Sequence, residues 1–139
     1  SDLSRYERQI MLDGIGIKGQ EKLKSSKVLV AGVGGLGSPA AYYLTAAGIG
    51  TIGLADFDEV SLSNLNRQIL HATNDIGRFK IDSAAEKLSS LHPDVQINKH
   101  CIKLTHENIA DTVKNYDVII DAVDNFETRF LINDSCYFL

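Results

Sequence analysis

Three glycines at fixed spacing lie in the stretch VLVAGVGGLGSPAAYYLTAAG, between an apolar run and a helix-forming segment. Gly32, Gly34 and Gly37 match the pattern G-x-G-x-x-G. In this pattern the first glycine makes a tight turn, the second lets the backbone approach a phosphate, and the third allows close helix–strand packing. The start of the following helix offers free backbone N–H groups to an anion. The motif predicts a nucleotide site but does not distinguish NAD from ATP, and it is not a Walker loop because no G-K-[ST] follows.

Two further polar positions follow the second apolar run. Asp56 ends that run, where a carboxylate can accept hydrogen bonds from ribose hydroxyls of either nucleotide. The connection after it, FDEVSLSNLNRQ, is rich in hydrogen-bonding groups, and Asn64 and Arg67 are spaced to face the same side of one helical turn. A guanidinium aimed at the glycine turn would bind phosphate oxygens bidentately. A solvated surface charge is the alternative for Arg67.

Additional charges favour a triphosphate ligand. Lys80, in GRFKIDSAAEKL, lies near the start of a predicted helix, where the helix dipole disfavours a cation unless an anion binds there. Together with Arg67 and Arg8 it could supply three positive charges. Asp121 lies at the end of the fourth apolar run and Asp124 just after it, at the sheet edge where ligands of this fold bind. Carboxylates with phosphate oxygens suit Mg²⁺. The alternatives are a surface charge for Lys80 and a helix cap for Asp124.

Four strand candidates must position these residues. The runs KVLVAG, TIGLAD, VQINKH and DVIIDA are each separated by enough chain for a crossover helix. Gly48 should end the first of these helices, and Thr105 should cap the helix that follows the third run. The alternation predicts an α/β fold, a Rossmann-like, doubly wound, mostly parallel sheet with helices on both faces. LSRYERQIML and QEKLKSS predict an N-terminal helical arm.

Bulk composition limits the partners and the compartment. The 139 residues fit one domain. A net charge of −4, from 14 basic and 18 acidic residues, provides no broad basic surface for nucleic acid. Since no membrane span or signal peptide is evident, a cytoplasmic protein without a membrane partner is expected. Cys101 and Cys136 form neither a disulfide framework nor a CxxC pair, and both are expected to be buried thiols.

Five motifs occur in order and at spacings similar to those of the ThiF/MoeB/HesA family, relatives of the ubiquitin-activating enzymes. They are RYERQI, GVGGLGS, DFDEVSLSNLNRQ, GRFK and DAVDN, and the resemblance extends from about Leu3 to Leu139. It implies ATP-dependent adenylation of the C-terminal glycine carboxylate of a ubiquitin-like or sulfur-carrier protein, with pyrophosphate release, as in molybdopterin or thiamine biosynthesis. An NAD-binding oxidoreductase domain and a non-catalytic partner subunit are the alternatives.

The resemblance also implies which residues bind the nucleotide. Gly34 and Gly35 would contact it in the glycine loop, and Asp56 would hold the ribose. Asn64 would handle phosphates together with the two cations that follow it in the sequence. The pattern of predicted helices and strands divides the chain into an arm over 1–26 and an ATP-binding Rossmann-like domain over 27–139. Because four strands make about half of the usual doubly wound sheet, the second part is expected to be the N-terminal part of a longer family domain.

Catalysis is assigned by the same resemblance to four charged residues. Arg67 and Lys80 would act on the phosphates, and Asp124 would serve the magnesium ion and the reacting centre. Arg8 would reach into the site of the other subunit of a homodimer. Many longer relatives carry CxxC zinc pairs, so zinc is expected only through a C-terminal region that this chain does not contain.

Overall fold

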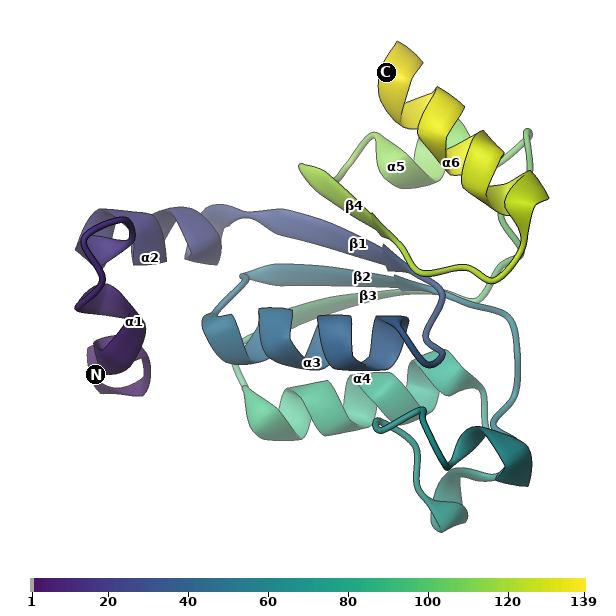
Figure 1. Ribbon diagram of the computed structural model, residues 1–139, viewed down its shortest axis with the longest axis horizontal. Coiled ribbons are helices and arrows are strands. Elements are labelled where there is room, and N and C mark those ends of the chain that lie inside the picture. Colours follow the sequence, from purple (N-terminus) through teal and green to yellow (C-terminus); the bar gives the residue numbers. More distant parts are fainter. Residues whose placement is uncertain (1) are drawn as a thin grey trace.

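The computed structural model describes residues 2–139 and contains a sheet of four parallel strands (Figure 1). The order across the sheet is β3-β2-β1-β4. The four runs predicted as strands are confirmed, with these bounds: β1 Lys27–Ala31, β2 Thr51–Ala55, β3 Gln96–His100 and β4 Val118–Asp121. Because β1 pairs with both β2 and β4, the order of strands reverses at β1, which is where ligands bind in sheets of this kind.

Helices cover both faces of the sheet, which confirms the doubly wound prediction. Figure 1 shows α3 (Gly37–Ala47) and α4 (Lys80–Leu91) on one face. The other face carries α5 (Ile109–Val113) and α6 (Phe126–Phe138). Because all four strands are parallel, they end at the same edge of the sheet, and the loops after the strands meet at that edge.

Side chains of β1 enter two separate cores because successive residues of a strand point to opposite faces. Val28 and Val30 belong to the core under α3 and α4, together with Leu88. Leu29 and Ala31 belong to the core under α5 and α6. These last four of the five residues of β1 are at most 4% exposed. This central strand fixes the position of the glycine turn that follows it.

Three local predictions have different outcomes. Gly48 ends α3 with a left-handed φ of 95°, as predicted. The prediction of a Thr105 cap is wrong, because α5 begins only at Ile109 and the Thr105 N–H donates to Asn108 Oδ1 at 2.9 Å. The prediction of buried thiols is also wrong, since Cys101 and Cys136 are both exposed. Neither outcome affects the strands that build the sheet.

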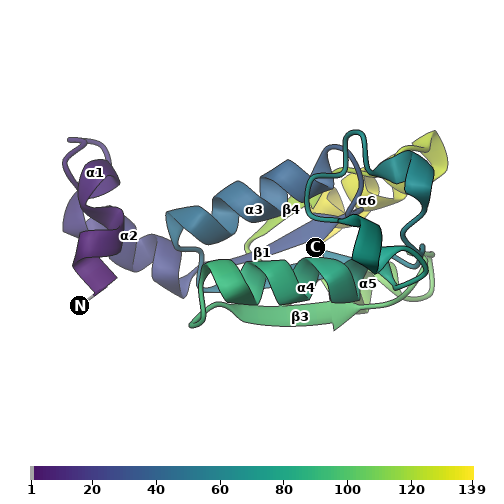
Figure 2. The same ribbon diagram turned by 90° about the horizontal axis from the view of Figure 1, so that it is seen from below.

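The N-terminal arm comprises a 3₁₀ helix, Asp2–Tyr6, followed by α1 (Glu7–Ile10) and α2 (Gly16–Ser25). It docks at the amino-terminal end of the sheet, where the Tyr6 hydroxyl hydrogen-bonds His92 after α4. Figures 1 and 2 show the arm at one end of the molecule and the loops after the strands at the other. The division into domains at residues 26 and 27 stays a prediction. Within residues 2–139, no helix has the length and apolar character needed to cross a membrane.

Candidate functional site

A cavity of about 720 Å³ opens at the carboxyl ends of the strands, beside the point where the strand order reverses. Its volume lies within the usual range for small-molecule and cofactor sites. Six segments of the sequence contribute to its wall. The wall includes six of the residues expected from the sequence to act on a nucleotide: Gly34, Gly35, Asp56, Arg67, Lys80 and Asp124.

The glycine turn offers hydrogen-bond donors to this cavity. Gly32 has a φ of 94°, a conformation that favours glycine. The backbone N–H groups of Gly34, Gly35 and Leu36 donate no hydrogen bond to any residue that the structure describes. Unpaired N–H groups at the beginning of a helix form a binding site for an anion. The turn therefore has the chemistry that a phosphate requires.

Asp56 ties the end of β2 to the turn after β1. Its Oδ2 accepts a hydrogen bond from the Val33 N–H at 2.8 Å, and its Oδ1 accepts one from the Asp58 N–H at 2.8 Å. These two bonds fix the orientation of the carboxylate. Each oxygen retains capacity to accept a further hydrogen bond, so Asp56 can bind sugar hydroxyls while it holds the turn in place.

Lys80 reaches the cavity because the connection after β2 folds back on itself. Glu59 and Phe79 form an antiparallel bridge, and the Lys80 N–H donates to the Asp58 carbonyl at 3.0 Å. The Lys80 residue is only 7% exposed, and its Nζ lies 3.8 Å from a carboxylate oxygen of Asp58. One carboxylate at that distance compensates poorly for burial of an ammonium group. An anionic ligand would compensate it better.

Arg67 lies across the glycine turn. Its Nη1 donates to the Ser63 carbonyl at 3.0 Å and to Asn66 Oδ1 at 2.9 Å. A Cβ added to Gly35 would lie 3.5 Å from the Arg67 Cγ. The Arg67 side chain therefore lies directly over the face of Gly35 that carries no side chain. A guanidinium carries five N–H donors. The groups that remain are available to phosphate oxygens.

Asn64 has a different position from the one that its spacing predicts. Its Oδ1 accepts from the Ser61 N–H at 2.9 Å and closes the 3₁₀ turn Leu62–Asn64. Its side chain does not belong to the cavity wall, while the Asn64 carbonyl accepts from the Arg67 N–H at 3.2 Å. Asn64 therefore shapes the segment that carries Arg67, and the structure does not bring the two side chains together.

The two aspartates at the end of β4 and just after it are not equivalent. Asp121 Oδ1 accepts from the Val123 N–H at 3.3 Å, and its Oδ2 lies 4.0 Å from Arg129 Nε. Asp124 lines the cavity, and its carboxylate makes no hydrogen bond or ion pair with other residues in 2–139. The alternative of Asp124 as a helix cap is wrong, because Asn125 Oδ1 accepts from the Thr128 N–H at 2.9 Å and caps α6.

The free carboxylate of Asp124 suits a hard cation that shares its other ligands with a nucleotide. Among residues 2–139 no three His, Cys, Asp or Glu side chains are grouped to hold a metal ion. Mg²⁺ is commonly bound by one or two carboxylates together with substrate phosphates and water. The residues present therefore fit a magnesium ion that arrives with the nucleotide.

Arg8 contributes nothing to the cavity of its own chain. It lies in α1 with an exposed side chain, and α1 belongs to the arm at the opposite end of the molecule from the loops after the strands (Figure 1). Its action on a cavity would require a second copy of the chain.

Sequence reasoning gave no role to six polar residues of the cavity wall: Asp58, Gln68, Lys103, Asn125, Thr128 and Arg129. Gln68 belongs to SNLNRQ, so its motif was noted without a role for its side chain. Arg129 follows DAVDN by one helical turn, and that spacing could have identified it. Lys103 follows β3 and carries no local signal, because only the order of the strands brings the end of β3 to this edge.

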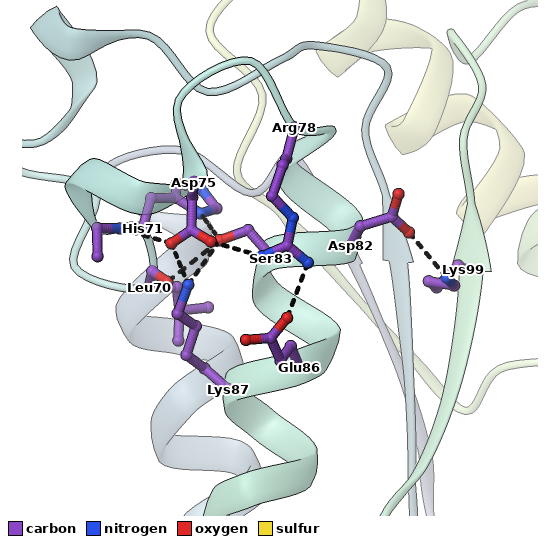
Figure 3. A network of polar contacts seen from close by, with 10 residues as sticks. Leu70, His71, Asp75, Arg78, Asp82, Ser83, Glu86, Lys87 and Lys99 are labelled. Carbon is purple, nitrogen blue, oxygen red and sulfur yellow. Dashed lines mark hydrogen bonds and ion pairs between the residues drawn. The ribbon is translucent and has the colours of Figure 1, made fainter.

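A network of polar contacts lies around the first turns of α4 (Figure 3), and His71 links it to the glycine turn. His71 Nε2 lies 3.1 Å from the Val33 carbonyl and His71 Nδ1 lies 2.8 Å from Ser83 Oγ. Since a carbonyl only accepts, Nε2 carries a proton, and when the imidazole is neutral the Ser83 hydroxyl donates to Nδ1. Lys87 Nζ then donates to Ser83 Oγ at 3.0 Å and pairs with Asp75. The network holds the turn against the helix that begins with Lys80.

The two titratable ends of this network have shifted pKa values. Burial lowers the pKa of His71 below its ordinary value of 6.5, and the charges of Lys80 and Lys87 add to this while Asp75 opposes it. Burial would raise the pKa of Asp75, but hydrogen bonds from Lys87 and the Ala72 N–H outweigh it and lower that pKa to about 2. These shifts favour a neutral His71 beside a charged Lys87–Asp75 pair.

Stability is expected to fall as the pH decreases below about 6.5, because the unfolded chain then binds a proton on His71 that the folded chain resists. The slope from this residue is at most one proton, about 1.4 kcal/mol per pH unit. His71→Gln should flatten the dependence measured by urea unfolding between about pH 7.5 and about pH 5.5. His100, whose pKa is also lowered by burial, supplies the slope that remains. Equal slopes for the wild type and His71→Gln would contradict the neutral state of His71.

Comparisons with known proteins match this chain over nearly all of its length. A family model described as ThiF family matches residues 6–139. The adenylyltransferase and sulfurtransferase MOCS3 of Aedes aegypti is 49% identical over 139 residues, which are 100% of this chain and 32% of that protein. A sulfur carrier protein adenylyltransferase of Thermus thermophilus is 44% identical over 138 residues, 99% of this chain and 51% of that protein. The chain thus spans about a third of one relative and half of the other.

A solved structure has the same fold. The tRNA N6-threonylcarbamoyladenosine dehydratase TcdA of E. coli, in complex with ATP, matches with a TM-score of 0.92 at 29% identity. The match covers 98% of this chain and 56% of that one. The resemblance in fold therefore extends over nearly the whole chain.

Proposed function

The chain belongs to the ThiF family, and from this premise we propose that it adenylates the C-terminal glycine carboxylate of a ubiquitin-like or sulfur-carrier protein with ATP. The observation that carries the proposal is the convergence of a glycine turn, a fixed carboxylate, two cations and a free carboxylate on one cavity. Two relatives at 49% and 44% identity are named adenylyltransferases. This combination favours an enzyme over a non-catalytic partner subunit.

The chemistry requires no base or covalent nucleophile from the protein. A terminal carboxylate is ionised at pH 7, so its oxygen attacks the α-phosphorus of ATP directly. A bond forms between them, the bond to the bridging oxygen breaks, and pyrophosphate leaves with the electron pair. The protein must hold two anions close together and stabilise the charge on the leaving group. We assign these tasks to Arg67, Lys80 and the N–H groups of the glycine turn.

The remaining residues of the cavity orient the nucleotide. Asp56 binds the ribose hydroxyls, because its carboxylate is held by two backbone N–H groups. Asp124 would hold a magnesium ion, as its unpaired carboxylate permits. When bound, the ion neutralises phosphate charge and favours departure of pyrophosphate. Asn64 acts through the turn that carries Arg67.

A carrier protein is favoured over a nucleic-acid substrate. TcdA is named for a modified tRNA base and its structure holds ATP, so nucleotide binding by itself does not distinguish the substrates. The net charge of this chain is −4, whereas nucleic-acid binding rests on a positive surface. Its identity is 49% to the adenylyltransferase of Aedes aegypti and 29% to TcdA. We therefore propose a protein carboxylate as substrate and, given two unpaired cysteines, the cytoplasm as its compartment.

Calorimetric titration tests the nucleotide. We expect this chain to bind Mg-ATP, to bind NAD at least tenfold more weakly, and to lose about tenfold or more of its ATP affinity in Arg67→Ala, since hydrogen bonds to charged groups contribute about 1.5 to 3 kcal/mol. Lys18→Ala, which removes an exposed cation from the arm, is the matched control and should bind ATP as the wild type does. Binding of NAD in preference to ATP would overturn the proposal in favour of an oxidoreductase domain.

We propose a homodimer, as the family resemblance implies for Arg8. We propose that this exposed arginine completes the cavity of a second copy, as it contributes nothing to its own. Inactive Arg8→Ala and Lys80→Ala proteins should regain about a quarter of wild-type pyrophosphate exchange when mixed in equal amounts, because random pairing leaves half of the dimers with one intact site. The measurement follows exchange as the mixing ratio varies. A mixture no more active than its components would contradict a role for Arg8 across the dimer.

A further inference from the structure

Gln68 is a buried side chain whose hydrogen bonds are missing. The residue is 4% exposed and lines the cavity. Its Oε1 is one of two buried side-chain polar atoms without a partner in the described part of the chain, and the other is the Thr45 hydroxyl. The backbone of Gln68 is fully engaged, because its N–H donates to the Asn64 carbonyl at 2.9 Å and its carbonyl accepts from the His71 N–H at 3.0 Å. Only the side chain lacks partners.

A second buried glutamine shows what the fold normally provides. Gln20 is 6% exposed, close to the value for Gln68. Its Nε2 donates to the Ala47 carbonyl at 3.0 Å, and its Oε1 accepts from Gln9. Buried polar groups without partners are uncommon and costly in folded proteins. The difference between Gln20 and Gln68 therefore requires an explanation, and it coincides with the cavity.

The amide of Gln68 lies beside the glycine turn. Its Nε2 would lie 3.5 Å from a Cβ added to Gly34, so it occupies the side of the turn that the missing side chain leaves open. No hydrogen bond from Nε2 reaches another residue in 2–139. The N–H groups of Gly34, Gly35 and Leu36 are unpaired in the same way. Four neighbouring donors without an acceptor define a site for an anion.

From this geometry we propose that Gln68 is a nucleotide-binding residue whose Nε2 donates a hydrogen bond to the phosphate chain of ATP seated on the glycine turn. The inference rests on the proposed function, because ATP is the anion that the cavity is inferred to bind. The Gln68 amide is already removed from water in the protein without ligand, so binding of ATP adds no further desolvation cost for it. The bound phosphate then supplies an acceptor for Nε2 without rearrangement of the loop, whereas Oε1 needs a donor and is not satisfied by the phosphate.

Titration of three variants with ATP and with adenosine tests the proposal. Gln68→Leu should weaken ATP binding about tenfold or more and leave adenosine binding within about twofold, since adenosine has no phosphate. Gln68→Glu should weaken ATP binding further, because a carboxylate repels the phosphates. The matched control is Gln20→Leu, which removes an equally buried amide far from the cavity. It should lower the melting temperature and keep the wild-type ATP affinity.

Melting temperatures without ligand separate binding from structural support. Gln68→Leu should melt at or above the wild-type temperature, because it removes a buried acceptor that has no donor, and Thr45→Val should behave likewise with unchanged ATP affinity. A lower melting temperature for Gln68→Leu, or an equal loss of ATP and adenosine affinity, would overturn the role of Gln68. Unchanged ATP binding in Gln68→Leu would overturn it as well. Absence of ATP binding in the wild type would reject the proposed function itself.

Discussion

Replacing Lys80 by methionine is expected to lower the rate of ATP–pyrophosphate exchange by about 100-fold or more, the usual effect of losing one preorganised group that stabilises developing charge. Lys80 is 7% exposed and its ammonium lies 3.8 Å from Asp58. Methionine keeps the length and apolar stem of the side chain and removes its charge. The exchange is measured with Mg-ATP, labelled pyrophosphate and a sulfur-carrier protein that ends in glycine.

The same substitution should leave the fold intact. A buried ammonium with one carboxylate at 3.8 Å gains little from that partner, so Lys80→Met should unfold at the wild-type urea concentration or above it. Lys114→Met is the control, because it removes an exposed cation that pairs with Asp111 at 2.6 Å in a region remote from the cavity. Wild-type exchange by Lys80→Met, or an equal loss in Lys114→Met, would remove Lys80 from its proposed role.

Replacing Gly37 by alanine is expected to lower the free energy of unfolding by about 3 kcal/mol or more, the upper range for overpacking. A Cβ at this position would lie 1.7 Å from the Gly32 carbonyl oxygen and 2.8 Å from its carbon. Both are backbone atoms of the turn that precedes α3, so neither can move without displacing β1 or the helix. Urea unfolding measures the loss, and ATP binding should disappear with it because the turn forms the phosphate site.

Two other glycines give the matched comparison. Gly14→Ala should be neutral, since a Cβ there meets nothing within 4 Å. Gly35→Ala should fold normally, because its Cβ would lie at an ordinary 3.5 Å from Arg67 Cγ, yet it should weaken ATP binding by filling the turn beneath Arg67. A Gly37→Ala protein as stable as Gly14→Ala would contradict the close approach of α3 to the turn after β1.

The cavity is organised before any ligand binds. The donors of the glycine turn have no internal acceptor, Gln68 has no partner for its amide, and the ammonium of Lys80 is buried beside one distant carboxylate. Each of these features lowers the stability of the empty protein. Such costs are typical of functional sites, where residues fixed in advance bind a ligand without further rearrangement. The His71 network belongs to the same design, because it fixes the turn from behind.

Local patterns in the sequence determined the strands and the turn. KVLVAG and DVIIDA are short apolar runs rich in β-branched residues, and such runs form buried strands in most surroundings. The spacing of Gly32, Gly34 and Gly37 identified a turn between strand and helix, since few residues other than glycine fit there. The motif set that includes SNLNRQ and GRFK identified the family. These signals depend on neighbours along the chain, so the sequence contains them directly.

Tertiary structure decided which side chains share the cavity. The strand order places β4 beside β1, and this order brings Asp124 close to a turn some ninety residues earlier in the sequence. It also adds Lys103 after β3. The amide oxygen of Gln68 lacks a partner in the packed structure, whereas the Asn64 side chain is fixed locally by its hydrogen bond from the Ser61 N–H. The physical reason is that hydrophobic patterns fix which residues form a strand, whereas the packing of whole elements fixes which strand ends meet.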